Sequence, residues 1–286
     1  MKLTEIINSD RLSLSFEVFP PKTGDAFESV KAATEKIAKL NPSYMSVTYG
    51  AGGGNSAYAL QIAENLKQKG VTPLAHLTCV SSTKAEINDR LTDFKNNGIE
   101  NILALRGDRP QDKALLKTDY SYASELIKDI KAFGGFCIGG ACYPESHPES
   151  ESSFKDIDNL KIKIEAGCEF LTTQMFFDNN IYYNFLYRLN NADIKVPVIA
   201  GIMPVTNPSS IKRICRISGS ALPQRFIRIV DRFGGSPEAM LDAGIAYATE
   251  QIIDLFANGV KAVHIYSMNN PEVAERIKNN IKSIIK

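Results

Sequence analysis

Polar and ionisable side chains stand at the ends of short apolar runs, and their types could do acid-base or ligand-binding chemistry. They are Glu17, Thr48, Tyr49, His76, Arg106, Asp108, Tyr143, Glu145, His147, Gln174 and Asp178. Burying a carboxyl, an imidazole and an amide costs free energy unless each group finds a partner. A shared functional site therefore explains this set better than core filling does.

Glu17 is the first candidate for catalysis. The alternation of the run around it places Ser15, Glu17 and Phe19 on one face of a strand, opposite Phe16 and Val18. A carboxyl among aromatic side chains has a raised pKa, which suits a general acid. A structural carboxylate paired with a nearby Arg or Lys is an equally good interpretation of this pattern.

Two turn-like segments could bind an anion. In the tripeptide that ends with Asp108, Gly107 lets a ligand approach the backbone and Arg106 offers a planar fork for phosphate. The glycine run at 50–54 lacks the Lys of a phosphate-binding P-loop, and Asn55 stands where a dinucleotide motif has its third Gly. An ion-paired turn and a flexible loop are the respective alternatives.

The histidines and cysteines do not indicate a metal. Taken alone, His76 is more typical of a core histidine than of a ligand, and prolines on both sides of His147 restrict its loop. Cys142, Glu145 and His147 fit no standard zinc spacing. The chain has five cysteines and no C-x-x-C pair, so we expect reduced and mostly buried thiols.

Eight β-branched or aromatic runs predict strands. They are Ser13 to Phe19, Met45 to Tyr49, Leu74 to Val80, Asn101 to Leu105, Cys137 to Tyr143, Phe170 to Phe177, Val198 to Met203 and Ala262 to Met268. A helix-like pattern follows each run. Asp25, Asn55 and Ser236 resemble helix caps, and the helix after Ser236 should end near Gly259. Strand and helix therefore alternate along the chain.

The spacing of the strands predicts the fold class. Steps of roughly 30 residues are typical of right-handed βαβ units. The last step is longer and leaves room for an extra helical segment around Pro223 to Arg232. We therefore predict an α/β protein, a single-domain (β/α)₈ barrel over residues 1–286, with its site at the carboxyl ends of the strands. A doubly wound sheet is the alternative.

Charge and hydropathy exclude some functions. The 33 basic and 32 acidic residues leave a net charge of +1, so nothing indicates a nucleic-acid or membrane-surface partner. No segment has the roughly 18 consecutive apolar residues that a membrane helix needs. The N-terminal residues lack the apolar stretch of a signal peptide, so we expect a cytoplasmic protein with small-molecule substrates.

A series of motifs resembles the methylenetetrahydrofolate reductases. In order they are Ser-Phe-Glu17-Val-Phe-Pro-Pro, Ser-Val-Thr48-Tyr49-Gly-Ala, His76-Leu-Thr-Cys, Ala-Leu-Arg106-Gly-Asp108, Tyr143-Pro-Glu-Ser-His147-Pro, Thr-Gln174-Met-Phe-Phe-Asp178, Gly-Ile-Met-Pro204-Val and His-Ile-Tyr-Ser-Met-Asn. The resemblance runs from about Leu12 to Asn270 and matches the catalytic barrel of the bacterial type alone.

The resemblance implies an activity and its cofactors. The family reduces 5,10-methylenetetrahydrofolate to 5-methyltetrahydrofolate in one-carbon and methionine metabolism. Electrons from NADH or NADPH pass through the N5 atom of bound FAD, which implies ping-pong kinetics. The resemblance also implies a homo-oligomer.

The resemblance assigns roles to single residues. Glu17 matches the general acid that protonates N10 of the folate. Asp108 matches a carboxylate beside the flavin and the pterin, Gln174 matches the amide that holds the pterin, and Thr48 matches a residue near the nicotinamide. The FAD contacts carry over onto Tyr49, Ala51, His76, Arg106, Gly107, Tyr122, Ala123, Tyr143, His147, Asp156, Asn159 and Lys163.

Three positions depart from the family pattern on the folate side. Asn270 stands where relatives carry an Arg, Ser210 where they carry a Gln, and Ile214 where they carry a Phe. Two other functions stay open at this point. One is a flavin-free barrel lyase or aldolase that uses Glu17 and His76 as acid and base, and the other is a flavoprotein subunit reduced by a partner protein.

Overall fold

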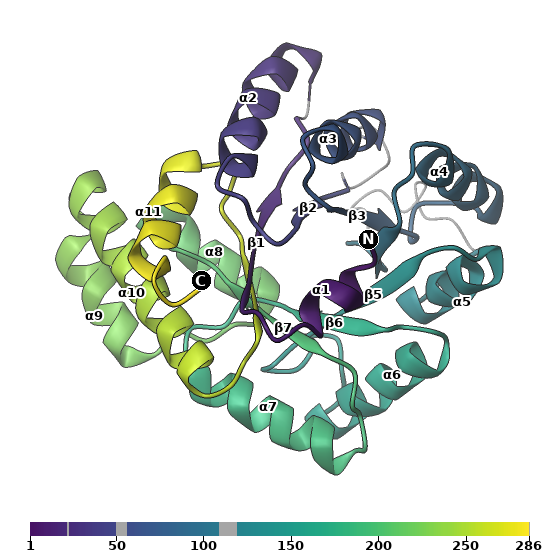
Figure 1. Cartoon of the computed structure of the whole chain (residues 1–286). Coiled ribbons are helices and arrows are strands. Elements are labelled where there is room, and N and C mark those ends of the chain that lie inside the picture. The colour runs from purple at the N-terminus through teal and green to yellow at the C-terminus, as the bar shows by residue number, and fades with distance from the viewer. Residues whose placement is uncertain (22, 50–55, 109–118, 286) are drawn as a thin grey trace.

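Eight parallel strands close into a barrel in the computed structural model, which describes residues 1–21, 23–49, 56–108 and 119–285, apart from the side chains at 56, 210 and 212. Figure 1 looks down this barrel. The strands are β1 (Ser13–Val18), β2 (Met45–Val47), β3 (Pro73–Thr78), β4 (Asn101–Leu105), β5 (Cys137–Cys142), β6 (Phe170–Thr173), β7 (Val198–Ile202) and β8 (Ala262–Ile265). Each strand pairs with the next along the chain, and β1 pairs with β8, which confirms the predicted (β/α)₈ barrel.

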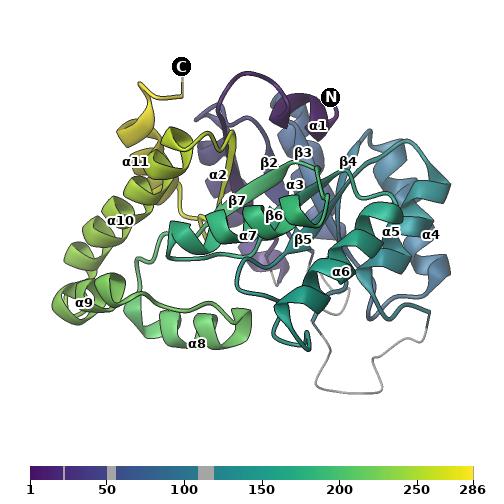
Figure 2. The ribbon, with the colours of Figure 1, turned by 90° about the horizontal axis from the view of Figure 1, so that it is seen from below.

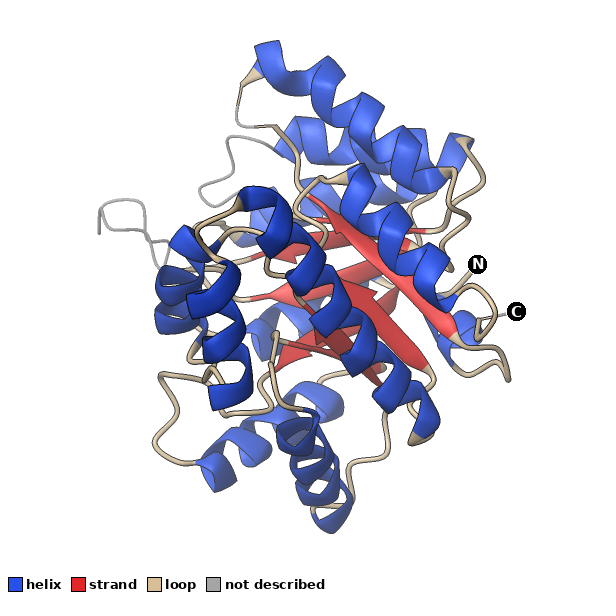
Figure 3. Cartoon of the chain, turned by 90° about the vertical axis from the view of Figure 1, so that its left-hand side faces the viewer, coloured by secondary structure: helices blue, strands red, loops and turns tan. Residues whose placement is uncertain are grey.

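Helices cover the outside of the barrel, as Figure 3 shows. They are α2 (Phe27–Ala38), α3 (Ser56–Gln68), α4 (Lys84–Asn96), α5 (Ala123–Phe133), α6 (Ser153–Glu165), α7 (Asn179–Asn191), α8 (Pro208–Ser218), α9 (Gln224–Phe233), α10 (Pro237–Ala257) and α11 (Pro271–Ile281), with a 3₁₀ turn η1 (Gly24–Ala26) before α2. The apolar faces of these helices, except α8 and α9, pack on the outer faces of the strands in one large core cluster. Helices α8 and α9 bury Ile211 and Phe226 in a separate cluster with Phe177. The five cysteines are free, and four of them are buried, as predicted.

A short helix closes one end of the barrel. Helix α1 (Leu3–Ile7) buries Leu3 and Ile7 against residues at the amino ends of the strands, among them Phe170. Figure 2 shows α1 at one end of the barrel and α8 at the other. The carboxyl ends of the strands therefore form the open face, which is where barrel enzymes have their active sites.

Several sequence-based boundaries are corrected by the structure. The strands end up to four residues earlier than predicted, and β6 stops at Thr173 although Phe176 and Phe177 are buried. Those two rings stack on Tyr182 and Phe226 outside the ladder, so the apolar run reflected burial and not strand. The predicted cap at Asp25 is wrong as well. That residue lies in η1, and no side chain caps the start of α2.

The helical insertion before the last strand is confirmed. Helix α9 begins at Gln224 and is preceded by Pro223, within one residue of the predicted segment. Helix α10 starts as predicted, because the Ser236 hydroxyl accepts a hydrogen bond from the Ala239 backbone, and it ends at Ala257. The helix cap predicted at Asn55 falls outside the described residues.

Asn101 provides a test of the closed end. Its side-chain oxygen accepts a hydrogen bond from the Leu3 backbone at 2.7 Å, and its side-chain nitrogen donates to the carbonyls of Met1 and Pro73. Asn101→Ala leaves buried backbone groups without partners and should lower the free energy of unfolding by about 2 kcal/mol. Urea denaturation measures this loss. The exposed Asn88→Ala is the control, and equal stability of the two variants would contradict the anchoring role.

Candidate active site

Neighbouring strands bring a set of polar side chains together inside the barrel. The β1–β2 register pairs Glu17 with Ser46, and the β1–β8 register pairs Ser15 with His264. All four side chains are buried, and His76 on β3 is buried beside them. The period-2 alternation predicted for β1 therefore places Ser15 and Glu17 toward the interior, as expected.

Glu17 and His76 form a close but uncharged pair. The carboxyl Oε2 lies 3.6 Å from His76 Nε2, and each side chain is 8% exposed. Burial raises the pKa of Glu17 to about 8 and lowers the pKa of His76 to about 3. Removal from water disfavours both charged forms, so near pH 7 a carboxylic acid faces a neutral imidazole rather than an ion pair.

His264 occupies a place that the sequence interpretation assigned to no residue. Its Nδ1 lies 2.8 Å from the Ser15 hydroxyl and its Nε2 lies 2.9 Å from the Ser46 hydroxyl. The ring stacks on Tyr44 at 5.6 Å and meets Tyr266 edge to face at 5.5 Å. The alternation of His264 and Tyr266 in the last strand motif was the available signal, because it puts both on one face.

Arg106, Gly107 and Asp108 follow β4 at the open face. The Arg106 guanidinium donates two hydrogen bonds of 2.7 Å to the Glu149 carboxylate. Gly107 has a φ of +84°, and a Cβ there would lie 3.0 Å from Thr78, so glycine suits this turn. Asp108 is exposed. The ion pair of the alternative interpretation is therefore present, and it leaves Asp108 at the rim.

A second group lies beyond the carboxyl end of β5. The rings of Tyr143 and His147 meet edge to face at 4.6 Å, and the His147 backbone donates to the buried Asp156 carboxylate. Lys163 donates to the carbonyl of Ala141 at 2.8 Å. Burial lowers the pKa of Lys163 and of His147, with the Arg106 charge the next cause at His147. The predicted cofactor residues Arg106, Tyr143 and His147, which follow β4 and β5, therefore lie close to Asp156 and Lys163 of α6.

The remaining predicted contacts lie around this face with different exposure. Thr48, Tyr49 and Gln174 are half-buried, Ala123 is buried, and Tyr122 and Asn159 are exposed. Ala51 falls outside the described residues, and the side chain of Ser210 is not described.

Two candidate residues cap helices. Asn270 accepts hydrogen bonds from the Glu272 and Val273 backbones and so begins α11. Asp178 accepts one from the Asn180 backbone and begins α7. A capping role explains these two polar residues at strand ends without a ligand.

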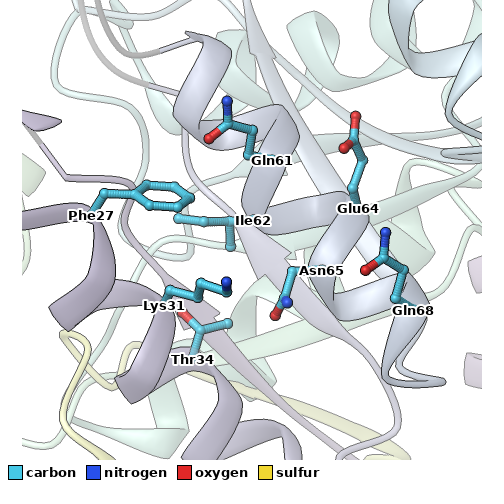
Figure 4. A pocket seen from close by; sticks show the side chains of 8 residues that line it. All are labelled: Phe27, Lys31, Thr34, Gln61, Ile62, Glu64, Asn65 and Gln68. Carbon is cyan, nitrogen blue, oxygen red and sulfur yellow. The ribbon is translucent and has the colours of Figure 1, made fainter.

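A groove in the helical layer lies apart from this set of residues. Figure 4 shows it between α2 and α3, lined by Phe27, Lys31, Ile62 and Asn65 among others. None of the predicted site residues lines it.

Neither a metal-binding cluster nor a membrane-crossing helix is present among the described residues. No group of three or more His, Cys, Asp or Glu side chains is arranged there to hold a metal ion. None of the helices in the same ranges has both the length and the apolar character that a membrane crossing requires.

A closed parallel barrel with a buried carboxyl near its open face is typical of barrel enzymes that use acid-base or cofactor chemistry. A family model described as methylenetetrahydrofolate reductase matches residues 2–282. The 5,10-methylenetetrahydrofolate reductase of Pectobacterium carotovorum subsp. carotovorum is 34% identical over 268 residues, covering 93% of this chain and 89% of that relative. The chain belongs to the methylenetetrahydrofolate reductase family.

Other relatives show how the chain compares in length and fold. Methylenetetrahydrofolate reductase (NADH) 1 of Zea mays is 32% identical over 98% of this chain, which spans 50% of that relative. A solved structure, an uncharacterized protein from Clostridium thermocellum that binds two copies of 5-methyl-5,6,7,8-tetrahydrofolic acid, has a TM-score of 0.72 at 16% identity. It covers 99% of this chain and 100% of its own, a likeness of fold.

The raised pKa of Glu17 predicts a pH-dependent stability. The folded protein holds the Glu17 proton up to about pH 8, whereas a glutamate side chain in water releases it near pH 4.5. The stability from this proton is fully present below pH 4.5 and is lost as the pH rises through 8. Between pH 5 and 9 the wild type should therefore lose on the order of 4 kcal/mol relative to Glu17→Gln.

Urea denaturation at a series of pH values measures this difference. The matched control is the same change at an exposed carboxyl, Glu28→Gln. An equal pH trend in both variants would contradict a buried, protonated Glu17.

Proposed function

We propose that this protein reduces 5,10-methylenetetrahydrofolate to 5-methyltetrahydrofolate, with FAD as cofactor and NADH or NADPH as electron donor. The observation that carries the proposal is Glu17, a buried carboxylic acid with a pKa of about 8 near the open face of a barrel of this family. The reaction serves one-carbon metabolism, where the methyl product supplies methionine formation.

Glu17 is the proton donor of the proposed reaction. Its O–H proton passes to N10 of the folate, and the bond between N10 and the methylene carbon then breaks with its electron pair on N10. The carboxylate left behind is buried among Tyr44, His76 and Tyr266, whose environment disfavours charge. A proton donor with a pKa near the working pH is efficient in such a step.

The side chains beyond β4 and β5 fit an anionic, ring-bearing cofactor. Arg106 is cationic, and the Lys163 amine donates to the Ala141 carbonyl. The Tyr143 and His147 rings lie together, and Gly107 has a positive φ that leaves the backbone after β4 accessible. Guanidinium and ammonium groups bind a diphosphate, and aromatic rings pack on flat ring systems. FAD held there by these residues would supply hydride transfer through its N5 atom.

Asp108 and Gln174 are the proposed contacts to the pterin. Asp108 is exposed at the rim after β4, while the Gln174 backbone donates to the Cys142 carbonyl at 2.8 Å and so fixes the start of its loop. Both groups can bind the donor and acceptor edge of a pterin. Thr48, half-buried after β2, is the proposed neighbour of the nicotinamide.

One open face implies alternating use by the two substrates. The nicotinamide and the folate would bind there in turn, which gives ping-pong kinetics. We propose that the chain acts as a homo-oligomer. Bound flavin in the purified protein, released on denaturation, is the first test. A protein that takes up no FAD on reconstitution would favour the flavin-free lyase with Glu17 and His76 as acid and base.

Glu17→Gln separates the two half-reactions. The amide keeps the shape of the side chain but cannot donate an acidic proton, so NADH or NADPH should still reduce the flavin. Methylenetetrahydrofolate should reoxidise it at least about 100-fold more slowly. Anaerobic stopped-flow absorbance measures both rates, and Glu28→Gln on the outer layer is the control. Normal reoxidation of the Gln variant would show that Glu17 is not the acid.

Asp108→Asn tests the proposed second carboxylate. Loss of a negative charge beside the flavin should raise its midpoint potential, because the reduced anionic form is then less repelled. Folate binding should weaken about 10-fold as one hydrogen-bonding partner changes character. Potentiometric titration and folate-dependent quenching measure the two effects. An unchanged potential together with unchanged folate affinity would remove Asp108 from the site.

A further inference from the structure

A chain of hydrogen bonds runs through the barrel interior beneath the acid. The Ser15 hydroxyl contacts the carbonyl of Val263 at 3.1 Å and Nδ1 of His264 at 2.8 Å. The other ring nitrogen of His264 lies 2.9 Å from the Ser46 hydroxyl. The Ser46 side chain also faces the Glu17 carboxyl, its register partner on β1. Four side chains from three strands are thus connected.

The number of available protons determines which group donates in each of these hydrogen bonds. A serine hydroxyl has one proton, and that of Ser15 is donated to the Val263 carbonyl, which can only accept. Ser15 must therefore accept from His264, which places a proton on Nδ1. Burial lowers the pKa of His264 to about 3, so the ring is neutral and carries one proton only. Its Nε2 is then an acceptor, and the Ser46 hydroxyl donates to it.

We infer that His264 is a positioning residue that takes up the Ser46 hydroxyl proton in a hydrogen bond and so leaves Ser46 as an acceptor for the protonated Glu17 carboxyl. The inference rests on the proposed function, because it concerns the group proposed as proton donor. Glu17 then keeps its proton for two reasons. It is excluded from water, and its acid form has an acceptor that its carboxylate form cannot use.

The other tautomer of His264 would have the opposite effect on the pKa of Glu17. With the proton on Nε2, His264 would donate to Ser46, and the Ser46 proton would be free to bind a Glu17 carboxylate. A donating Ser46 lowers the pKa of Glu17, whereas an accepting Ser46 raises it. The sign of one measured shift therefore separates the two arrangements.

Among the described residues, the titratable groups that face Glu17 and His264 are neutral. Glu17 and His264 are faced by His76 from β3, by Tyr44 before β2 and by Tyr266 after β8. Burial lowers the pKa of His76 to about 3 and raises the pKa of both tyrosines. These neighbours are neutral near pH 7, so the proton on Glu17 responds to the hydrogen-bond direction and to burial.

The tautomer of His264 can be observed directly. The chain has only three histidines, so ¹⁵N-histidine labelling with His76→Gln and His147→Gln for assignment identifies the His264 ring signals. Long-range ¹H–¹⁵N correlation spectra of the resting protein should place its proton on Nδ1. A proton on Nε2 would overturn the inference.

The pKa of Glu17 gives the second measurement. The carbonyl stretch of its protonated carboxyl, isolated in infrared difference spectra against Glu17→Gln, is followed with pH. Ser46→Ala removes the acceptor and should lower this pKa by roughly one unit. Ser15→Ala removes the group that fixes the His264 tautomer and should also lower the pKa of Glu17. The hydrogen bonds of Ser15 go to Val263 and His264, so this effect would be indirect.

The matched control is Ser13→Ala. Ser13 lies on the same strand with a buried hydroxyl that has no hydrogen-bond partner, so its removal should leave the Glu17 pKa unchanged. A rise of the pKa in Ser46→Ala, or no change in Ser46→Ala and Ser15→Ala, would overturn the inference. Thermal unfolding checks that each variant is folded. If a variant does not fold, the His264 tautomer in the wild-type spectrum still tests the inference.

The His264 tautomer and the Glu17 pKa test the inference separately from the proposed function. Both are made on the resting protein without folate or nicotinamide, so an inactive protein would leave them unchanged. If the reductase activity is present, the pH profile of flavin reoxidation by methylenetetrahydrofolate should move with the Glu17 pKa in Ser46→Ala. The rate of flavin reduction by the nicotinamide should keep its pH profile.

Discussion

Exclusion of water from the barrel interior is the constraint on which the proposed chemistry depends. It removes the charge from Glu17 and from two imidazoles, His76 and His264, which at the surface would titrate several pH units away. A carboxyl and a histidine 3.6 Å apart therefore stay neutral instead of forming an ion pair. An acid that has given up its proton in this environment is unstable, and a step that returns the proton is correspondingly favoured.

The rest of the fold maintains that dry interior. Closure of β1 against β8 leaves no open edge, and α1 covers the amino ends of the strands through Leu3, Ile7 and the Asn101 hydrogen bonds. Only the carboxyl ends remain open, and Arg106 lies there half-buried and paired with Glu149. The barrel thus encloses a neutral carboxyl in its interior and places a cationic side chain at its open end.

Much of this arrangement could be predicted from the sequence, because strand periodicity and spacing are local properties. The alternation around Glu17 predicted its inward direction, and the repeating strand runs predicted the barrel. The ends of the strands were less predictable, since Phe176 and Phe177 are apolar because they pack outside the ladder. A run of apolar residues reports burial, not hydrogen bonding.

The missed parts of the site depend on residues far apart in the chain. His264 meets Ser15 and Ser46 only because the register of β1, β2 and β8 brings them together, and no local pattern encodes that meeting. The partner of Arg106 was missed for a similar reason, because Glu149 lies in a loop without periodicity. Asn270 was considered for the folate tail, yet its side chain begins α11.

Anaerobic titration of the purified wild-type protein tests the central claim most directly. NADH or NADPH is added first, and methylenetetrahydrofolate is added afterwards under the same conditions. The account predicts that the nicotinamide bleaches a bound flavin and that the folate restores the oxidised spectrum with formation of 5-methyltetrahydrofolate. A reduced flavin that oxygen reoxidises but methylenetetrahydrofolate does not, or a protein that binds no flavin, would contradict it.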